Sequence, residues 1–129
     1  MATLERILFV EDDLDIQEIA RLALQMVGGF DVSLMSSGEE ALEKAKDLNP
    51  QLILLDVMMP GMDGPSTLRE LRKMPEFTNI PVIFMTARVQ PHEVAEYKEL
   101  GALDVISKPF DPMTLSNTIL SIWEQHQGS

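Results

Sequence analysis

The stretch Gln51–Gly64, QLILLDVMMPGMDG, contains an almost wholly apolar run that stops at a single carboxylate. The four aliphatic residues Leu52–Leu55 are too few for a useful helix and are typical of a strand that is buried on both faces. Asp56 stands at the carboxyl end of this predicted strand, and the proline and glycines after it predict a loop over the same edge. The sequence therefore places one acid at the end of a central strand.

Length and composition restrict the class of protein. The 129 residues, 45% hydrophobic and 24% charged, are typical of one soluble globular domain with no room for a second core. The chain has no cysteine, which excludes thiolate catalysis and zinc-thiolate sites. A net charge of -11 disfavours a nucleic-acid partner, because phosphate binding needs clustered lysine and arginine. Without a bilayer-spanning run or a leader at Met1–Arg6, we expect a cytoplasmic protein that does not bind membranes.

Strands and helices are predicted to alternate along the whole chain. Apolar runs predict five strands, at residues 6–10, 30–35, 52–55, 81–85 and 102–107. Helical spacing and capping residues predict helices over about 13–27, 37–48, 66–74, 91–100 and 111–125, with N-caps at Asp13, Ser37 and Asp111. This alternation indicates an α/β protein whose five-stranded parallel sheet is covered on both faces. We expect the flavodoxin-like doubly wound (βα)5 fold with strand order 2-1-3-4-5.

The spacing of apolar residues also predicts which helix faces are buried. Tyr97 and Trp123 are interpreted as packing residues rather than as interface anchors. The predicted buried positions are Ile16, Ile19, Ala20, Ala23 and Val27 in the first helix, Leu68 and Leu71 in the third, and Leu115, Ile119, Ile122 and Trp123 in the last.

Carboxylates are expected to gather at the topological switch point between strands one and three, where ligands bind in such sheets. Glu11 and Asp12 follow strand one, so a strand spacing of about 4.8 Å brings them close to Asp56. Three neighbouring carboxylates repel one another, and a hard divalent cation with oxygen ligands relieves that repulsion. Mg²⁺ is the natural candidate for this site.

Two further groups follow strands four and five. Thr86 is expected to lie about one strand spacing, about 4.8 Å, from Asp56, and Lys108 about 10 Å away, a gap that its long side chain largely covers. Taken singly, these residues also fit a turn, a cap or a solvated lysine. Together they predict a phosphoryl site in which Asp56 is the nucleophile, Lys108 and the cation neutralise charge, and Thr86 binds a phosphoryl oxygen.

The motifs that hold these residues resemble those of the receiver domains of two-component response regulators. VEDD ends strand one, LLDVMMPGMDG ends strand three, MTA ends strand four and SKPF ends strand five, in the family's order and across nearly the whole chain. The resemblance implies that Asp56 accepts a phosphoryl group from a phosphohistidine and that the protein then changes its contacts with other proteins. It implies a signalling phosphoacceptor that catalyses its own phosphorylation and dephosphorylation, and not otherwise an enzyme.

The resemblance also assigns individual roles. Asp12 is expected to ligate Mg²⁺ directly together with Asp56, Glu11 mainly through water, and Met58 through its backbone carbonyl. Thr86 takes the family's switch role and Lys108 pairs with the phosphate. The peptide bond that follows this lysine, before Pro109, is expected to be cis.

One position departs from the family's pattern. Many receivers have tyrosine or phenylalanine three residues before the conserved lysine, and the position of that ring follows the threonine. This chain has Val105 there. The signal is therefore expected to pass through backbone shifts of the loop after strand four, through helix four, or through another side chain.

The same resemblance suggests how the chain is used. Only four residues follow the predicted end of the last helix, so we expect residues 1–129 to form a stand-alone, chemotaxis-type receiver with no output domain. Its expected partners are a sensor histidine kinase or histidine phosphotransfer protein, and a target bound through the face of helix four, strand five and helix five. It is expected to be a monomer or a phosphorylation-dependent dimer.

Two other functions compete with this one. A phosphatase of the haloacid-dehalogenase type also uses a strand-end aspartate and Mg²⁺, but it needs a second acid two residues later, where this chain has Met58. A receiver-like protein that acts without phosphate would be expected to have lost Asp56, Thr86 or Lys108, and all three are present.

Overall fold

The fold is a single five-stranded parallel sheet with helices on both faces. The computed structural model describes residues 3–128. The strand order β2-β1-β3-β4-β5 confirms the predicted doubly wound arrangement. The strands are β1 (Arg6–Val10), β2 (Asp31–Met35), β3 (Leu52–Asp56), β4 (Val82–Thr86) and β5 (Asp104–Ser107).

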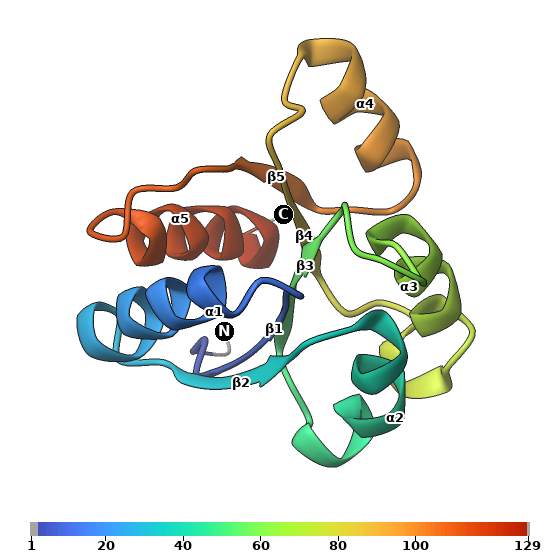
Figure 1. Ribbon diagram of the computed structural model, residues 1–129, viewed down its shortest axis with the longest axis horizontal. Coiled ribbons are helices and arrows are strands. Elements are labelled where there is room, and N and C mark those ends of the chain that lie inside the picture. Colours follow the sequence, from blue (N-terminus) through green and yellow to red (C-terminus); the bar gives the residue numbers. More distant parts are fainter. Residues whose placement is uncertain (1–2, 129) are drawn as a thin grey trace.

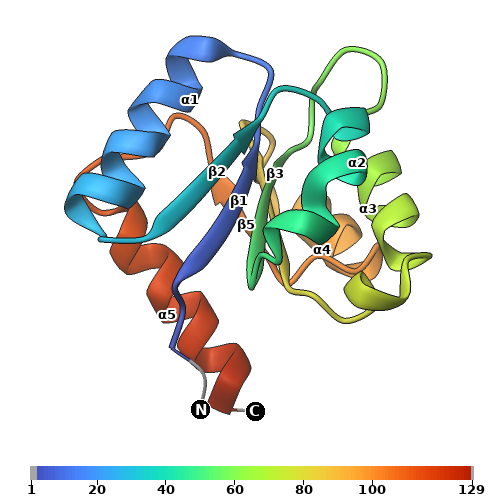
Figure 2. The same ribbon diagram turned by 90° about the horizontal axis from the view of Figure 1, so that it is seen from below.

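The helices divide into two layers. Helices α1 and α5 cover one face of the sheet, and α2, α3 and α4 lie on the other (Figure 1, Figure 2). Within residues 3–128, no helix combines the length and apolarity needed to cross a bilayer. The helices are α1 (Leu14–Arg21), which continues into the π-helix η1 (Leu22–Val27), α2 (Gly38–Leu48), α3 (Gly64–Arg72), the 3-10 turn η2 (Pro75–Phe77), α4 (Pro91–Glu99) and α5 (Leu115–Gly128).

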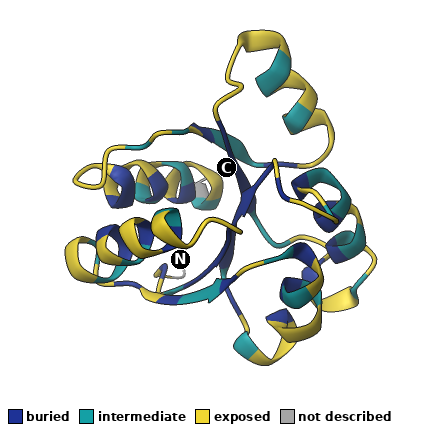
Figure 3. Ribbon diagram, in the orientation of Figure 1, coloured by how far each residue is buried: buried dark blue, intermediate teal, exposed yellow. Residues whose placement is uncertain are grey.

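The core lies on both sides of the central strands. Every residue of β3 and β4 is buried, as the continuous apolar runs predicted, whereas the outer strands β2 and β5 are only partly covered (Figure 3). One apolar cluster packs β-strand side chains against α1 and α5, and a second packs them against α2 and α3. The central strands are therefore held from both faces, and their carboxyl ends are fixed in position.

Several boundaries differ from the predicted ones for local reasons. Helix α3 begins two residues early because Asp63 caps it, accepting a hydrogen bond from the Ser66 N–H at 2.8 Å. Strand β2 begins one residue later than predicted, β4 runs from Val82 to Thr86, and β5 begins at Asp104. Helix α5 begins at Leu115, after a turn in which Asp111 accepts a hydrogen bond from the Met113 N–H, and it runs to Gly128.

Two predictions for the first helix are wrong. Ile19 is 44% exposed and Val27 is 50% exposed, and Leu24 is fully buried in their place. Val27 lies beyond Arg21, where the chain enters the π-helix and the apolar phase predicted for 3.6 residues per turn no longer holds. The wider turn is supported from α5, because the buried Ser116 hydroxyl donates to the Ala23 carbonyl at 2.8 Å. Ile19 instead lines an open cleft on the surface.

The remaining predicted packing is largely confirmed. Asp13 and Ser37 cap α1 and α2 with their side chains. Leu68, Leu71, Leu115, Ile119 and Trp123 are buried, Ile16, Tyr97 and Ile122 are partly buried, and Ala20 and Ala23 are buried.

Candidate functional site

The site is built by the carboxyl ends of two neighbouring strands. Val10 of β1 pairs with Leu55 of β3, so the next residue in each strand, Glu11 and Asp56, is carried to the same edge of the sheet. The Glu11 N–H donates to the Met35 carbonyl of β2 at 3.0 Å, which extends the strand hydrogen bonding by one residue. Glu11 and Asp56 therefore lie side by side, and both are held in place by strand hydrogen bonding rather than by a flexible loop.

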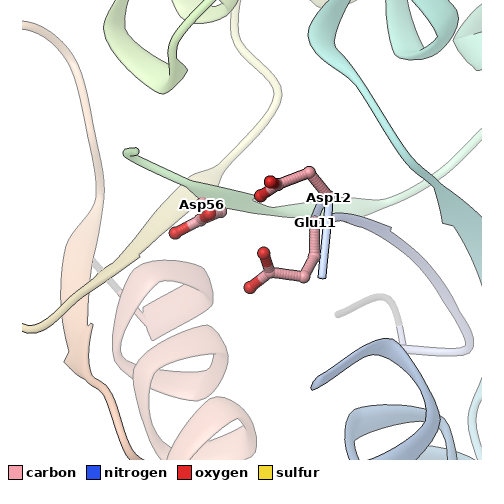
Figure 4. A group of neighbouring side chains, drawn as sticks. All are labelled: Glu11, Asp12 and Asp56. Atoms are coloured by element: carbon pink, nitrogen blue, oxygen red, sulfur yellow. The ribbon is translucent and has the colours of Figure 1, made fainter. Parts of the chain in front are cut away.

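Three carboxylates meet at this edge. Oxygen atoms of Glu11, Asp12 and Asp56 all lie within 4.8 Å of one another. Figure 4 shows the three side chains gathered at the ends of β1 and β3. Glu11 and Asp56 are only 1% and 3% exposed, whereas Asp12 is exposed to solvent. The cluster is thus covered on its sheet side and open on the Asp12 side.

Lys108 supplies the positive charge of the site. Its Nζ lies 2.8 Å from Glu11 Oε1 and 3.1 Å from Asp56 Oδ1. The Lys108 N–H donates to the Thr86 carbonyl at 3.0 Å, which fixes where this side chain leaves the sheet, and the expected cis bond to Pro109 is present. The contact with Asp56 was predicted, but the shorter contact with Glu11 was not.

The buried Glu11 and the partly buried Lys108 shift each other's pKa values. Burial raises the pKa of Glu11 to about 7, the charge of Asp56 adds to the rise, and the Lys108 hydrogen bond opposes it. Burial lowers the pKa of Lys108, but its hydrogen bonds to Glu11 and Asp56 outweigh that effect, so the pKa lies above its usual value. The ammonium therefore stays charged at neutral pH, whereas Glu11 is only partly ionised there.

Thr86 is buried at the end of β4, and its predicted role of binding a phosphoryl oxygen stays a prediction. Met85 is the residue paired with Asp56, so Thr86 lies one residue beyond it along the edge. The Thr86 hydroxyl oxygen accepts a hydrogen bond from the Arg88 N–H at 3.1 Å. In this structure Thr86 therefore ties down the start of the loop that leads to α4.

The donor set fits a hard divalent cation. Three carboxylates against one ammonium leave an excess of negative charge, and carboxylate oxygens are the ligands that Mg²⁺ prefers. The exposed Asp12 leaves the solvent side open, where a cation that keeps several waters can be held. The Met58 side chain is 65% exposed, and the role of its backbone carbonyl stays a prediction.

A buried glutamine on α1 was missed from the sequence. Gln17 Nε2 donates to the Glu11 backbone carbonyl and, at 3.2 Å, to the Ser36 hydroxyl. Because Gln17 is nearly buried, these bonds hold the turn after β1 in a fixed position. The sequence feature that could have predicted its burial is its spacing, because Gln17 shares a helix face with the buried Ala20 and Leu24.

Comparison with known proteins places this geometry in a family. Residues 7–120 match the family model of the response regulator receiver domain. The chain is 40% identical over 122 residues to the transcriptional regulatory protein CseB of Streptomyces coelicolor, and 39% identical over 119 residues to the CpxR homolog of Haemophilus influenzae. These matches cover 95% and 92% of the chain but 50% of each relative. The chain thus spans about half the length of the curated relatives that it matches.

Solved structures agree over nearly the whole chain. The chemotaxis protein CheY4 of Vibrio cholerae has a TM-score of 0.85 at 30% identity, over 93% of this chain and 99% of CheY4. A response regulator from Desulfuromonas acetoxidans has a TM-score of 0.82 at 31% identity, over 94% and 98% of the two chains.

Proposed function

The chain belongs to the family of response regulator receiver domains of two-component systems, and from this premise we propose that Asp56 is its phosphoacceptor. The observation that carries the proposal is the position of Asp56. It ends a fully buried strand, with Lys108 Nζ 3.1 Å from Oδ1 and two further carboxylates beside it. A rigid carboxylate with a cation at hydrogen-bond distance is prepared for nucleophilic attack on phosphorus.

The proposed reaction is a simple transfer. A carboxylate oxygen of Asp56 forms a bond to phosphorus while the P–N bond of a phosphohistidine breaks, and the electron pair of that bond goes to the imidazole nitrogen. The Lys108 ammonium neutralises charge on the phosphoryl oxygens. The Thr86 hydroxyl, which accepts from the Arg88 N–H in the unphosphorylated protein, carries its own proton and can donate it to a phosphoryl oxygen once it turns toward Asp56. Water attack on the same phosphorus would later restore the Asp56 carboxylate.

Mg²⁺ is the proposed cofactor. Asp12, Asp56, Glu11 and the Met58 carbonyl would hold it, directly or through water. When bound, it supplies positive charge that offsets repulsion between the carboxylates and the incoming phosphoryl group.

A surface beside the site supports docking of a macromolecular phosphodonor. Ile16 and Ile19 of α1, together with Pro109 and Phe110, line an apolar cleft of about 310 Å³ that also includes Lys108. An apolar cleft adjoining the reacting groups is suited to a partner that must bring its phosphohistidine to Asp56. We propose a sensor kinase or phosphotransfer protein for this role, and a protein target at the face of α4, β5 and α5.

Phosphorylation by a small donor tests the proposal directly. With acetyl phosphate and Mg²⁺, intact-mass spectrometry is expected to detect one added phosphoryl group, as the P–O bond breaks and acetate leaves. Asp56→Asn should abolish the adduct. Asp31→Asn is the matched control, because Asp31 is an exposed acid at the start of β2, and it should leave the adduct unchanged.

Two results would contradict the proposal: a wild-type protein that forms no adduct, or an Asp56→Asn variant with an undiminished one. Sustained turnover of an ordinary phosphate ester would favour the phosphatase alternative instead.

A further inference from the structure

Helix α4 is held more weakly than the other helices. It has no buried residue, whereas α1, α2, α3 and α5 each bury several (Figure 3). It packs mainly against β5, at the edge of the sheet, and stands apart from the other helices in Figure 1. Its ion pair to β5, Lys98 with Asp104, is partly exposed and 3.7 Å long, which makes it a weak tie.

One aromatic contact links α4 to the central sheet. The Tyr97 ring, partly buried, meets the fully buried Phe84 ring of β4 edge to face, with 5.3 Å between centroids and 87° between planes. Phe84 pairs in register with Val105 of β5, the position where many receivers have an aromatic residue. The ring that covers Phe84 in this chain therefore comes from α4.

The same strand connects this contact to the site. Phe84 lies two residues before Thr86 in β4, and the Thr86 hydroxyl holds the Arg88 N–H at 3.1 Å. The residues from Ala87 to Gln90, which join Thr86 to α4, are all exposed. The hydrogen bond from Arg88 to Thr86 thus ties the site edge to the beginning of the loop that leads to α4.

We propose that Tyr97 is the positioning residue through which phosphorylation moves α4, in place of the aromatic residue that position 105 lacks. The proposal rests on the proposed function of Asp56. When the Thr86 hydroxyl turns to bind a phosphoryl oxygen, the Arg88 N–H loses its partner and the loop is released. Helix α4 then shifts along the sheet, and the Tyr97 ring leaves its edge-to-face contact with Phe84. Val105 carries no ring or polar group that could perform this step.

The single tyrosine of the chain allows a direct test. Protein labelled with 3-fluorotyrosine has one fluorine resonance, which reports on Tyr97 alone. Acetyl phosphate and Mg²⁺ are expected to produce a second resonance whose area matches the phosphorylated fraction measured by intact mass. An adduct on Asp56 without any change of this resonance would overturn the proposal for Tyr97 and leave the proposed function standing. A protein that forms no adduct would contradict both.

Two variants at Thr86 test the connecting step. Thr86→Ser keeps the hydroxyl and should keep the second resonance. Thr86→Val removes the acceptor of the Arg88 N–H at nearly the same shape, so even without phosphorylation its resonance is expected at the position of the phosphorylated wild type, and the adduct should not move it further. An unphosphorylated Thr86→Val resonance at the position of the unphosphorylated wild type would overturn the coupling through the hydroxyl.

Hydrogen exchange tests whether the ring holds the helix. Tyr97→Ala, without phosphorylation, should raise amide exchange in residues 91–99 toward the level of the phosphorylated wild type and leave exchange in residues 14–21 unchanged. If exchange in residues 91–99 stays unchanged, the proposal for Tyr97 is overturned. The proposal that Asp56 is phosphorylated would still stand.

Discussion

Glu11 carries a buried carboxylate whose ionisation opposes folding. Its pKa rises from 4.5 to about 7 on folding, first because of burial and then because of Asp56. Between these two values the folded protein binds more protons at Glu11 than the unfolded chain does. The contribution of Glu11 to stability therefore falls as pH rises through this window, and the penalty is complete above it.

A neutral isostere at this position should remove that penalty. In chelator-treated protein we expect Glu11→Gln to have nearly wild-type stability near the lower end of the window and to be more stable, by on the order of 2 kcal/mol, above pH 7. Urea unfolding across the pH range measures the difference. Glu43→Gln is a matched control, because it removes the same charge at an exposed position. A wild-type pH profile in Glu11→Gln would contradict this account.

At the residue scale, the gathering of the site side chains at one edge was predictable and their hydrogen-bond partners were not. Asp56 and Thr86 end their strands and Glu11 and Lys108 directly follow theirs, and parallel strands carry such residues to one edge whatever their side-chain conformations. The contacts of Lys108 with Glu11 and of Thr86 with the Arg88 N–H depend on side-chain conformation and burial, which periodicity does not encode. Gln17 was missed although its spacing places it on the buried helix face, because its polar side chain is of a type that is mostly exposed.

At the scale of elements, the start of α3 is packed against the reacting strand. A β-carbon added at Gly64 would lie 2.6 Å from the Asp56 carbonyl oxygen and 2.9 Å from Val57 Cα. Both are backbone atoms, so the crowding cannot be relieved by turning a side chain. The glycine therefore lets α3 begin directly beside the end of β3.

Gly64→Ala is expected to weaken both stability and phosphorylation. We expect a loss of about 1–3 kcal/mol, which is typical of overpacking, and a slower rate of adduct formation because Asp56 is displaced. Urea unfolding and timed intact-mass measurements check the two effects. Ser66→Ala, in the same helical turn, should change stability by less than about 0.5 kcal/mol. Wild-type behaviour of Gly64→Ala would show that α3 can shift freely.

Elements were predicted well where propensity and packing agree. The continuous apolar runs of β3 and β4 and the cap of α2 left little choice of structure. The π-helix η1 was not predictable, because its wider turn depends on Ser116 of α5, 93 residues away in sequence from the Ala23 carbonyl that it contacts. The start of α5 was misplaced because Asp111 forms a turn of its own before the helix.

At the scale of the whole molecule, the chain carries a large net negative charge, and part of that charge is concentrated at one edge of the sheet. The chain has a net charge of -11, and three of its acids converge on one edge. A cation that binds this edge in the folded state alone stabilises the protein through mass action. The strand order was predictable because alternating strands and helices with right-handed crossovers leave few arrangements, and this order fixed where the acids meet.

Mg²⁺ should therefore stabilise the protein beyond any effect of ionic strength. We expect MgCl₂ to raise the thermal midpoint above that in NaCl of equal ionic strength, with the stabilisation growing by about 1.4 kcal/mol for each tenfold increase in Mg²⁺ well above the dissociation constant. Asp12→Asn should reduce this specific gain while keeping the general response to salt. Equal midpoints in the two salts would argue against a Mg²⁺ site at Glu11, Asp12 and Asp56.

The two ends of the parallel sheet differ in function, because only the end at which the strands finish carries the site. All of the site residues lie at the carboxyl ends of strands or shortly after them, whereas residues 28–30, 49–51 and 101–103, which precede strands, contribute none of them and lie at the opposite edge of the sheet. Within these connections Phe30, Pro50 and Ala102 are buried, so inserted sequence is best tolerated at the exposed Gly29, Asn49 and Gly101. An affinity handle or reporter grafted there could anchor the protein to a surface with its reacting edge facing the solution.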